Sequence, residues 1–415
     1  MLVKKLYIYS ILHFYLIQFR IMLDMYLQHM EPFTQGAGMI EEKFDITIIG
    51  AGLVGLAVAD NLSANYTNVA VLEKNDSYGQ ETSSRAGEII HSGLYFPAGF
   101  FKGDFCRAGN RALYEICAQR NVSHRRVGKI IVATGFEQIE KLSEIKVKGE
   151  ENGVDDLSIV SKRQIHELEP DVKAEEGLFS PSTGIIDIHN LMRSFVHQAE
   201  ANGAIVVYRS RVTGIDYDGN YYVVEVNHGE YYFKTKVLIN SAGLYADQIA
   251  AFVGIDIDKQ GYRIHYSKGS FFSSSSAPKL RHLVWPVNPK RDNKGNTSRG
   301  VHTDIDLSGN VKFGPHWEYV NELNYAVDES KRDVFYQSIR NYLPSVPLES
   351  IFPDMSGIRP QLQGPNDQYK DFVIKDEVNT GYSGLINLIG IECPGFTTCI
   401  PIARYVDTLV KPYFE

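Results

Sequence analysis

The chain has 415 residues, 44% of them hydrophobic and 22% charged, and this balance is typical of a folded globular protein rather than a fibrous or disordered one. The length is sufficient for two domains with sizeable cores. The formal net charge of -8 at pH 7 excludes a generally basic surface, so we expect no nucleic-acid partner. An anionic substrate has to be bound by basic side chains that are placed locally.

The cysteines indicate a reducing compartment. Cys106, Cys117, Cys393 and Cys399 have no paired C-x-x-C spacing and are too few for a disulfide scaffold. We therefore expect a cytoplasmic location, with membrane association as an alternative and a mitochondrial location if the source is eukaryotic. We expect no metal site.

Residues 1–40 form an N-terminal extension that differs in character from the rest of the chain. Two lysines precede an aromatic-rich apolar run from Leu6 to Phe19, which is shorter than the ~20 apolar residues of a membrane span. Two interpretations stay open. The extension targets the chain or makes a peripheral membrane contact, or translation starts later, for example at Met39. We favour the later start and expect no catalytic residue in this segment.

The first regular elements expected after the extension are a buried strand, Ile46–Ile49, and a helix that follows it directly. Between them, Gly50, Gly52 and Gly55 have the G-x-G-x-x-G spacing. The first glycine permits a tight turn, the second lets the backbone approach a pyrophosphate, and the third lets the helix pack against the strand. The anion then lies at the helix N-terminus, where unpaired N–H groups and the helix dipole attract it.

An acidic residue follows the second expected strand, Val69–Leu72. Glu73 stands where a carboxylate hydrogen-bonds the ribose hydroxyls and disfavours a 2′-phosphate. A glycine fingerprint alone is a weak signal, but here strand, glycines, helix, second strand and acid occur in order. The stretch predicts a dinucleotide site for FAD or NAD rather than NADP.

A segment rich in small and hydroxyl residues comes next, GQETSSRAGEIIHSGLY from Gly79 to Tyr95. Backbone N–H groups and hydroxyls of such a segment can bind phosphate along a cofactor, and a solvated loop is the alternative. The helical pattern from Phe100 to Arg120 is expected to be scaffold.

The rest of the chain alternates helices with β-rich segments. Expected strands are Lys129–Ala133, Val212–Asp216, Tyr221–Val226, Tyr231–Lys234 and Val237–Asn240, and expected helices are Gly135–Gly149, Leu191–Asn202 and Glu329–Tyr342. A strand at Ile386–Ile389, a glycine turn and a closing helix end the chain. The nucleotide-binding sheet is therefore visited early, in the middle and at the end.

Several longer motifs occur in order between about Asp45 and the C-terminus. They are TSSRAGEIIHSGLYFP from Thr82, VGKIIVAT from Val127, GIIDIHNLM from Gly184, NSAGLYAD from Asn240, RGVHTDIDLSGNVKFGP from Arg299, SGIRPQL from Ser356 and GIECPGFTT from Gly390. With them the sequence resembles the D-amino-acid-oxidase-like FAD-dependent oxidoreductases, and among these the L-2-hydroxyglutarate dehydrogenases and oxidases. An ordered set of motifs is far more specific than one glycine fingerprint.

The resemblance implies FAD as cofactor and oxidation of a dicarboxylate, L-2-hydroxyglutarate, to 2-oxoglutarate. It implies an α/β fold in which a Rossmann-like FAD-binding domain is interleaved with an α+β substrate domain built on a large mixed or antiparallel sheet. We assign residues 45–128, 185–255 and 352–415 to the FAD-binding domain, and residues 129–184 and 256–351 to the substrate-binding domain.

The resemblance also implies the cofactor contacts. Gly50, Gly52, Gly55 and Glu73 match the pyrophosphate and ribose contacts, Ser83, Ser84 and Arg85 the stretch beside the flavin, and Val212 an adenine-side backbone contact. A second flavin-side loop is matched by Ala242 and Gly243, and the turn and helix start that face the flavin pyrimidine edge by Gly390, Ile391, Pro394 and Gly395.

The chain departs from the family pattern in three places. The family usually reads SSRNSE where this chain has SSRAGE from Ser83 to Glu88, and it has Asp where His316 follows FGP. It usually has Ser where Cys393 stands. A covalent bond to the flavin and an inert buried thiol are the two interpretations of this cysteine.

Oxidation of a secondary alcohol needs a group that accepts the hydroxyl proton, a group that binds carboxylate and an oriented flavin. His91 is the candidate base because histidine accepts protons near neutral pH, and a hydrogen-bonded loop histidine is the alternative. Arg359 is the candidate catalytic carboxylate clamp, with a structural salt bridge as the alternative. Four further residues are candidates for substrate binding: Tyr95, Tyr266, Lys268 and His302.

Other functions stay open at this point. Because only one complete glycine fingerprint is present, the electron acceptor is oxygen, a quinone or an electron-transfer protein rather than a second bound dinucleotide. An amino acid, sarcosine or glycerol 3-phosphate is the alternative substrate. A flavin-binding protein without turnover is the alternative from a different class.

Overall fold

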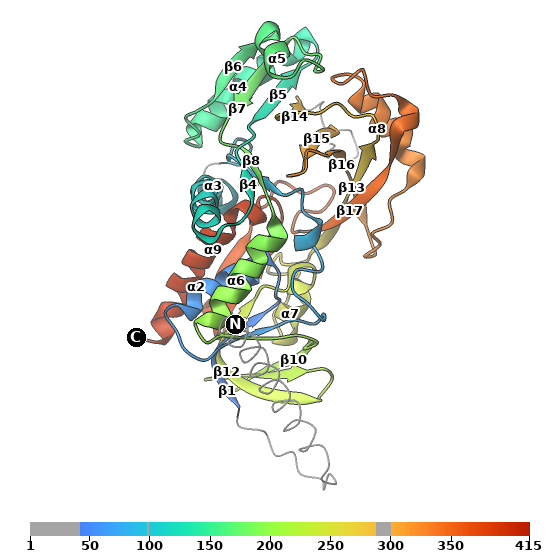
Figure 1. The fold of residues 1–415 in the computed structure, drawn as a ribbon. Helices are drawn as coiled ribbons and strands as arrows, with labels where there is room; N and C mark the ends of the chain where they lie inside the picture. The colour runs from blue at the N-terminus through green and yellow to red at the C-terminus, as the bar shows by residue number, and fades with distance from the viewer. Residues whose placement is uncertain (1–41, 98, 288–299) are drawn as a thin grey trace, which may run out of the picture. The chain divides into compact units, whose positions relative to one another are not determined.

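A sheet of eight strands carries the nucleotide-binding half of the chain (Figure 1). Its centre is parallel: β1 (Lys43–Ile49) lies between β2 (Val69–Leu72) and β12 (Tyr231–Asn240), and β9 (Ile205–Val207) and β19 (Tyr382–Ile389) extend the parallel part. Three antiparallel strands complete it: β10 (Val212–Tyr217), β11 (Tyr222–Val226) and β18 (Val373–Glu377). Since the parallel strands end at one edge, the loops that follow them meet there.

Helices cover one face of this sheet. In Figure 1, α2 (Leu53–Ser63) lies beside α6 (Ile188–Ala201) and α9 (Gly395–Val410), and α3 (Phe101–Arg120) packs on α9. Their apolar side chains form one core with the strand residues that point to the same side, such as Ile46 and Ile48. On the opposite face, α7 (Ala246–Phe252) packs against the sheet in a second core. Both faces of β1 are therefore buried, which explains its continuous apolar run.

Residues 231–240 form one strand, whereas the sequence predicted two. Thr235, in the expected gap, pairs with Phe44 on one side and Tyr222 on the other, and its side chain is fully buried. Backbone pairing on both sides keeps this polar residue extended, so the strand continues through it. The prediction of separate strands at Tyr231–Lys234 and Val237–Asn240 is wrong in this respect.

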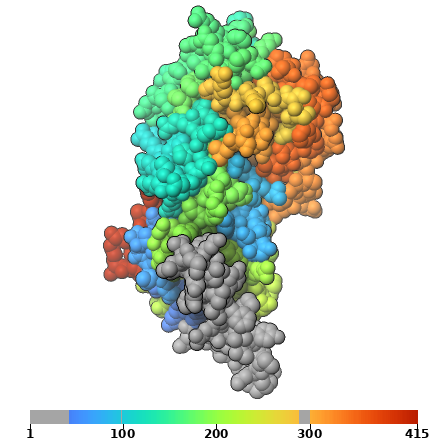
Figure 2. Space-filling model, viewed as in Figure 1, coloured from blue at the N-terminus to red at the C-terminus, as the bar shows by residue number. Residues whose placement is uncertain are grey.

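Two smaller sheets carry the remaining half. An antiparallel sheet has the order β15 (His302–Ile305), β16 (Val311–Val320), β13 (His265–Ser274), β17 (Ile351–Gln361), and α8 (Arg332–Ile339) packs on it. The other sheet has the order β14 (Leu283–Pro286), β5 (Lys129–Ala133), β7 (Glu176–Ser180), β6 (Ser158–Ser161), with α4 (Ile139–Glu151) and α5 (Lys162–Leu168) against it. Because β14 pairs with β5, residues near 130 and near 285 are held together. On the surface in Figure 2, the green and gold parts of the chain adjoin in the upper half of the molecule.

Short strands connect the two halves. Strand β8 (Gly184–Ile186) pairs with both β3 (Ile89–Ile90) and β4 (His124–Arg125). The pairing with β3 fixes the backbone just before His91. The strand pairing therefore fixes the backbone position of His91, which follows β3 directly.

This computed structural model describes residues 42–97, 99–287 and 300–415, so the predicted extension at residues 1–40 lies outside the described residues. The predicted α/β fold with an interleaved sheet-rich half is confirmed. Residues 41–415 form one compact unit, and the exact domain boundaries stay a prediction. Within the described ranges, no helix has the length and apolar character to cross a membrane, and no cluster of three or more His, Cys, Asp or Glu side chains could bind a metal.

Candidate active site

A cavity of about 620 Å³ lies at the carboxyl ends of the parallel strands, within the size range of cofactor sites. The last residues of β1 and β2 line it, and so do Ser241, which follows β12, and the loop after β19. It extends from there along β17 to residues of β14, β15 and β16. One continuous cavity therefore joins the glycine turn to the antiparallel sheet.

The glycine turn has the close packing that its spacing predicts. Gly50 has a φ of +102°, which favours glycine, and a Cβ on Gly55 would lie only 2.0 Å from the Gly50 carbonyl oxygen. The helix therefore starts directly against the strand. At this start, the Leu53 N–H donates to Ser83 Oγ at 3.0 Å, and Gly52 lines the cavity. This arrangement fits a pyrophosphate bound at the N-terminus of α2.

The Glu73 carboxylate, which the sequence predicts to bind ribose, accepts two backbone hydrogen bonds in the structure. Its Oε2 accepts a hydrogen bond from the Ala51 N–H at 2.9 Å, and its Oε1 accepts one from the Asn75 N–H at 2.9 Å. The carboxylate thus ties the end of β2 to the glycine turn. It also lines the cavity, so its predicted contact with ribose stays compatible with this geometry.

Most of the other predicted cofactor residues line the same cavity. They are Ser83, Arg85, Val212, Ala242, Gly243, Ile391, Pro394 and Gly395. Three predicted residues do not: Gly55 packs against the turn, Ser84 Oγ donates to the Glu81 carbonyl, and Gly390 lines a separate small cavity. The residues on the wall nonetheless form a continuous track whose glycines leave room for a planar ring, so they fit FAD.

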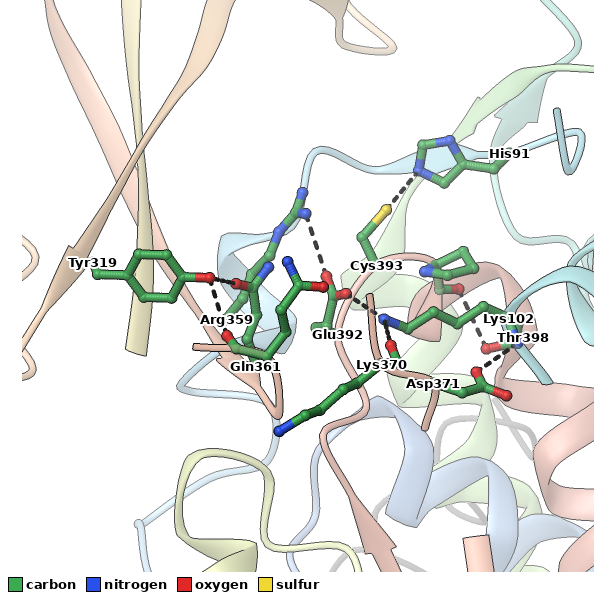
Figure 3. Close-up of polar contacts among 12 residues, drawn as sticks. His91, Lys102, Tyr319, Arg359, Gln361, Lys370, Asp371, Glu392, Cys393 and Thr398 are labelled. Atoms are coloured by element: carbon green, nitrogen blue, oxygen red, sulfur yellow. Dashed lines mark hydrogen bonds and ion pairs between the residues drawn. The ribbon is translucent and has the colours of Figure 1, made fainter. Parts of the chain in front are cut away.

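His91 lies on the cavity wall, and its backbone is fixed on both sides. Its N–H donates to Thr397 Oγ1 at 3.0 Å, and its carbonyl accepts from Asn110 Nδ2 at 3.0 Å. The ring Nε2 lies 3.4 Å from Cys393 Sγ (Figure 3). The imidazole is therefore held next to the loop after β19, where the resemblance places the flavin.

Arg359 belongs to a network of charges rather than standing alone. Its Nη1 lies 3.3 Å from Glu392 Oε2, while Lys102 Nζ lies 2.7 Å from Glu392 Oε1 (Figure 3). The guanidinium also stacks on Trp317, 3.7 Å from the ring centroid. Two cations share one carboxylate, so the three side chains Arg359, Lys102 and Glu392 together carry a net charge of +1, and of the two cations only Arg359 lines the cavity. That surplus is suited to an anionic ligand.

Three predicted substrate residues do not line the cavity. Tyr95 stacks on Trp285, a residue of the cavity wall, with 6.2 Å between the ring centroids. Tyr266 Oη donates to the Leu244 carbonyl at 3.5 Å, and Lys268 Nζ donates to the Ala326 carbonyl. Tyr95 therefore packs on a wall residue without lining the cavity itself. The Lys268 ammonium group is hydrogen-bonded to a backbone carbonyl oxygen outside the cavity.

His302 does line the cavity, together with residues that the sequence argument missed. These are Asp304, Trp285, Trp317 and Glu392. Asp304 is two residues after His302 in β15, so both side chains point to the same face of the strand. That spacing was visible in the motif RGVHTDID, but only the structure shows which face borders the cavity.

The three departures from the family pattern involve Gly87, His316 and Cys393, and each has a different environment. Gly87 lies against Asp304: a Cβ there would be 2.8 Å from Asp304 Oδ2. Burial and the nearby Lys331 lower the pKa of His316, which does not line the cavity. Burial raises the pKa of Cys117 to about 12, so this thiol stays protonated. Cys393, in contrast, is half-buried on the cavity wall.

The family follows from a comparison of the whole sequence. Residues 45–409 match the model of the family described as FAD dependent oxidoreductase. The chain belongs to this family. It is therefore an FAD-dependent oxidoreductase, which needs a small-molecule substrate and an electron acceptor.

The chain is also similar to named members of this family. The chain is 34% identical to "L-2-hydroxyglutarate dehydrogenase, mitochondrial" of Arabidopsis thaliana, over 88% of this chain and 83% of the relative. It is 27% identical to "Glycerol 3-phosphate dehydrogenase" of Caloramator mitchellensis, over 89% of this chain and 74% of the relative. Among solved structures, L-alpha-glycerophosphate oxidase from Mycoplasma pneumoniae with FAD bound matches with a TM-score of 0.79 and 22% identity, covering 89% of this chain and 95% of the other. This last likeness supports the fold alone.

Proposed function

We propose that the chain oxidises L-2-hydroxyglutarate to 2-oxoglutarate with FAD as its cofactor. The observation that carries the proposal is the position of Arg359 and its surplus positive charge on the same cavity wall as two histidines. The identity to the Arabidopsis dehydrogenase supports this substrate over other 2-hydroxy acids. The chemistry requires both features, because the substrate is an anion that must lose a proton and a hydride.

FAD, when bound, supplies at N5 the acceptor for the hydride that leaves the hydroxyl-bearing carbon. The glycine turn and the loops at Ser83, Ala242 and Ile391 would hold it, since all of them line the cavity. The residues of the chain supply the rest. In this proposal Arg359 binds a substrate carboxylate, and His91 accepts the hydroxyl proton as the carbonyl of the product forms.

Glycerol 3-phosphate is the second candidate substrate, because a relative with 27% identity is named as its dehydrogenase. A phosphate dianion favours several clustered cations. The substrate end instead has one guanidinium on its wall, Arg359, because Lys102 pairs with Glu392 from outside the cavity lining. A single guanidinium suits a carboxylate better than a phosphate dianion.

Flavin reduction without oxygen tests the proposal. Holoenzyme mixed with L-2-hydroxyglutarate is expected to lose the absorbance of oxidised flavin and to form one equivalent of 2-oxoglutarate per FAD. Glycerol 3-phosphate, glycine and sarcosine are the comparison substrates. Bleaching by one of these, with none by L-2-hydroxyglutarate, would reject the proposed substrate, and no bleaching by any would favour a flavin-binding protein without turnover.

The acceptor and the location are tested separately. Oxygen, a quinone and an electron-transfer protein are the three acceptors to compare, by following reoxidation of the reduced enzyme with each. For a eukaryotic source we propose a mitochondrial location, which cell fractionation checks.

A further inference from the structure

Two buried polar side chains line the substrate end of the cavity without the partners that buried groups normally have. His302 and Asp304 are each 5% exposed. Their atoms Nδ1 and Oδ1 lie 3.1 Å apart, which is an ion-pair distance, but the two are not aligned as a hydrogen bond. Neither atom has another hydrogen-bond partner in the part of the chain that the structure describes. Buried polar groups are nearly always satisfied, so these two atoms are expected to pair with each other when a ligand in the cavity aligns the His302 ring.

The ring of His302 is held in place by aromatic stacking. It lies parallel to the Trp285 ring, with 3.8 Å between centroids, and Trp285 is itself buried. Lys129 Nζ is 4.3 Å from the Trp285 centroid. A stacked ring whose Nδ1 is buried beside Asp304 leaves Nε2 as the nitrogen that can meet a ligand.

Charge decides what the pair can bind. Three carboxylates line the substrate end of the cavity: Glu88, Asp304 and Glu392. Burial raises the pKa of Glu88, and Glu392 is neutralised by Lys102 and Arg359. Among the residues that the structure describes, Asp304 has no cation within ion-pair distance except His302. An unneutralised carboxylate here would repel an anionic substrate at low effective dielectric constant. A proton on both nitrogens of His302 removes that repulsion and presents an N–H donor to the substrate.

We propose that His302 binds substrate as an imidazolium, with Nδ1–H paired to Asp304 and Nε2–H donated to one carboxylate of a dicarboxylate, while Arg359 binds the other. Asp304 is a positioning residue, because it fixes the ring and balances its charge. The assignment rests on the proposed function for its substrate class. It adds a second carboxylate subsite and explains why a site for a dianion contains a buried aspartate.

Other titratable side chains surround the pair and must be considered in a test by pH. They are Lys129 across Trp285, His91 at the edge of Trp285, Lys312 opposite Asp304 in β16, and Tyr342, whose hydroxyl donates to the Val301 carbonyl. Burial, and then the Asp304 carboxylate, raise the pKa of Tyr342, so its hydroxyl stays neutral. Histidine is the side-chain type that titrates near neutral pH, which makes His91 the rival of His302 in such a test.

Binding of glutarate to the oxidised holoenzyme is the test. Glutarate has both carboxylates of the proposed substrate but no hydroxyl group to oxidise, and perturbation of the flavin spectrum reports its affinity. Since the bound form carries the proton, the affinity is expected to fall as pH rises, approaching tenfold per pH unit. The variant His302→Gln should bind glutarate roughly 30-fold more weakly at pH 6 and lose the pH dependence.

The variant Asp304→Asn tests whether Asp304 positions and charges the His302 ring or only stabilises the fold. It lacks the charge that stabilises the imidazolium, so its affinity should be low at pH 7.5 and recover towards wild type at pH 6, a recovery that His302→Gln cannot show. The matched control is His282→Gln, since His282 pairs with Glu169 at 2.8 Å in a similar buried histidine–carboxylate pair that does not line the cavity. This control should bind glutarate as wild type does.

Three results would overturn the assignment, two of them from the binding measurements and one from NMR. One is an unchanged pH dependence in His302→Gln, above all if His91→Gln abolishes it. The other is absence of glutarate binding at every pH. Nitrogen-15 NMR of the His302 ring in the glutarate complex gives a readout without turnover, and a single protonated nitrogen there also rejects the imidazolium. Failure of the proposed function is distinct, because it appears as no flavin reduction by L-2-hydroxyglutarate, whatever the outcome with glutarate.

Discussion

The two ends of the cavity are built in different ways. At the nucleotide end, the backbone makes the site: three glycines, the N-terminus of α2 and the ends of β1 and β2 lie within one short stretch of chain. At the substrate end, side chains make the site, and they come from segments far apart, such as His91, Asp304 and Arg359. A backbone site tolerates little added volume, whereas a side-chain site changes in charge and geometry with each substitution.

This difference predicts two separable kinds of variant. Changes at the nucleotide end should affect how much FAD the protein holds and leave the substrate preference alone. Changes at the substrate end should leave FAD content unchanged and affect its reduction. A single substitution at one end that changed both the FAD content and the rate of flavin reduction would contradict this distinction between the two ends.

The largest effect is expected for His91→Ala. If His91 accepts the hydroxyl proton, flavin reduction by saturating L-2-hydroxyglutarate should slow by roughly 10² or more. FAD content should stay at one per chain, because the backbone of residue 91 keeps its contacts with Thr397 and Asn110. Stopped-flow absorbance measures the rate. The variant His124→Ala, at a histidine that does not line the cavity, is the control. A normal rate in His91→Ala would leave this histidine with a structural role beside Cys393.

A smaller effect, at the other end, is expected for Gly55→Ala. Its Cβ would be 2.0 Å from the Gly50 carbonyl oxygen, so the helix must move away from the strand and from the pyrophosphate position. Overpacking of this kind costs about 2 kcal/mol, which corresponds to roughly 30-fold weaker FAD binding. Fluorescence titration of apoprotein with FAD measures it.

Gly109→Ala is a matched control for that clash. A Cβ on residue 109 would also be 2.0 Å from a carbonyl oxygen, that of Thr397. Gly109 lies between α3 and α9, however, and does not line the cavity. The control should lose thermal stability without losing FAD affinity. Equal losses of FAD affinity in both variants would mean that global stability, not the glycine turn, determines cofactor binding.

The same difference explains what the sequence could predict. The nucleotide end depends on contiguous spacing and on glycine conformation, and both can be recognised in a sequence; the fold, the glycine turn and the cofactor were predicted correctly. Tyr231–Asn240 was divided wrongly because Thr235 is paired on both sides, which no local pattern reports.

The substrate end depends on which face of a strand borders the cavity and on which ions pair. Lys268 was a reasonable candidate cation, but its strand directs it to the Ala326 carbonyl. Glu392 and Asp304 were missed because carboxylates are not expected on the wall of a site for an anion. Their roles appear only when Lys102 and His302 are seen beside them.

The smallest effect is expected for Arg359→Lys. A lysine keeps the positive charge next to Glu392 but loses the planar guanidinium that stacks on Trp317 and can bind a carboxylate through two N–H groups. We expect KM for L-2-hydroxyglutarate to rise about tenfold, equivalent to about 1.4 kcal/mol, with kcat and FAD content little changed. Arg263→Lys, at an exposed pair with Asp258, is the control. Because the charge is conserved, an unchanged KM would mean that the substrate senses only the net charge of the network, while a fall in kcat with unchanged KM would place Arg359 at the reacting carbon instead of at a carboxylate.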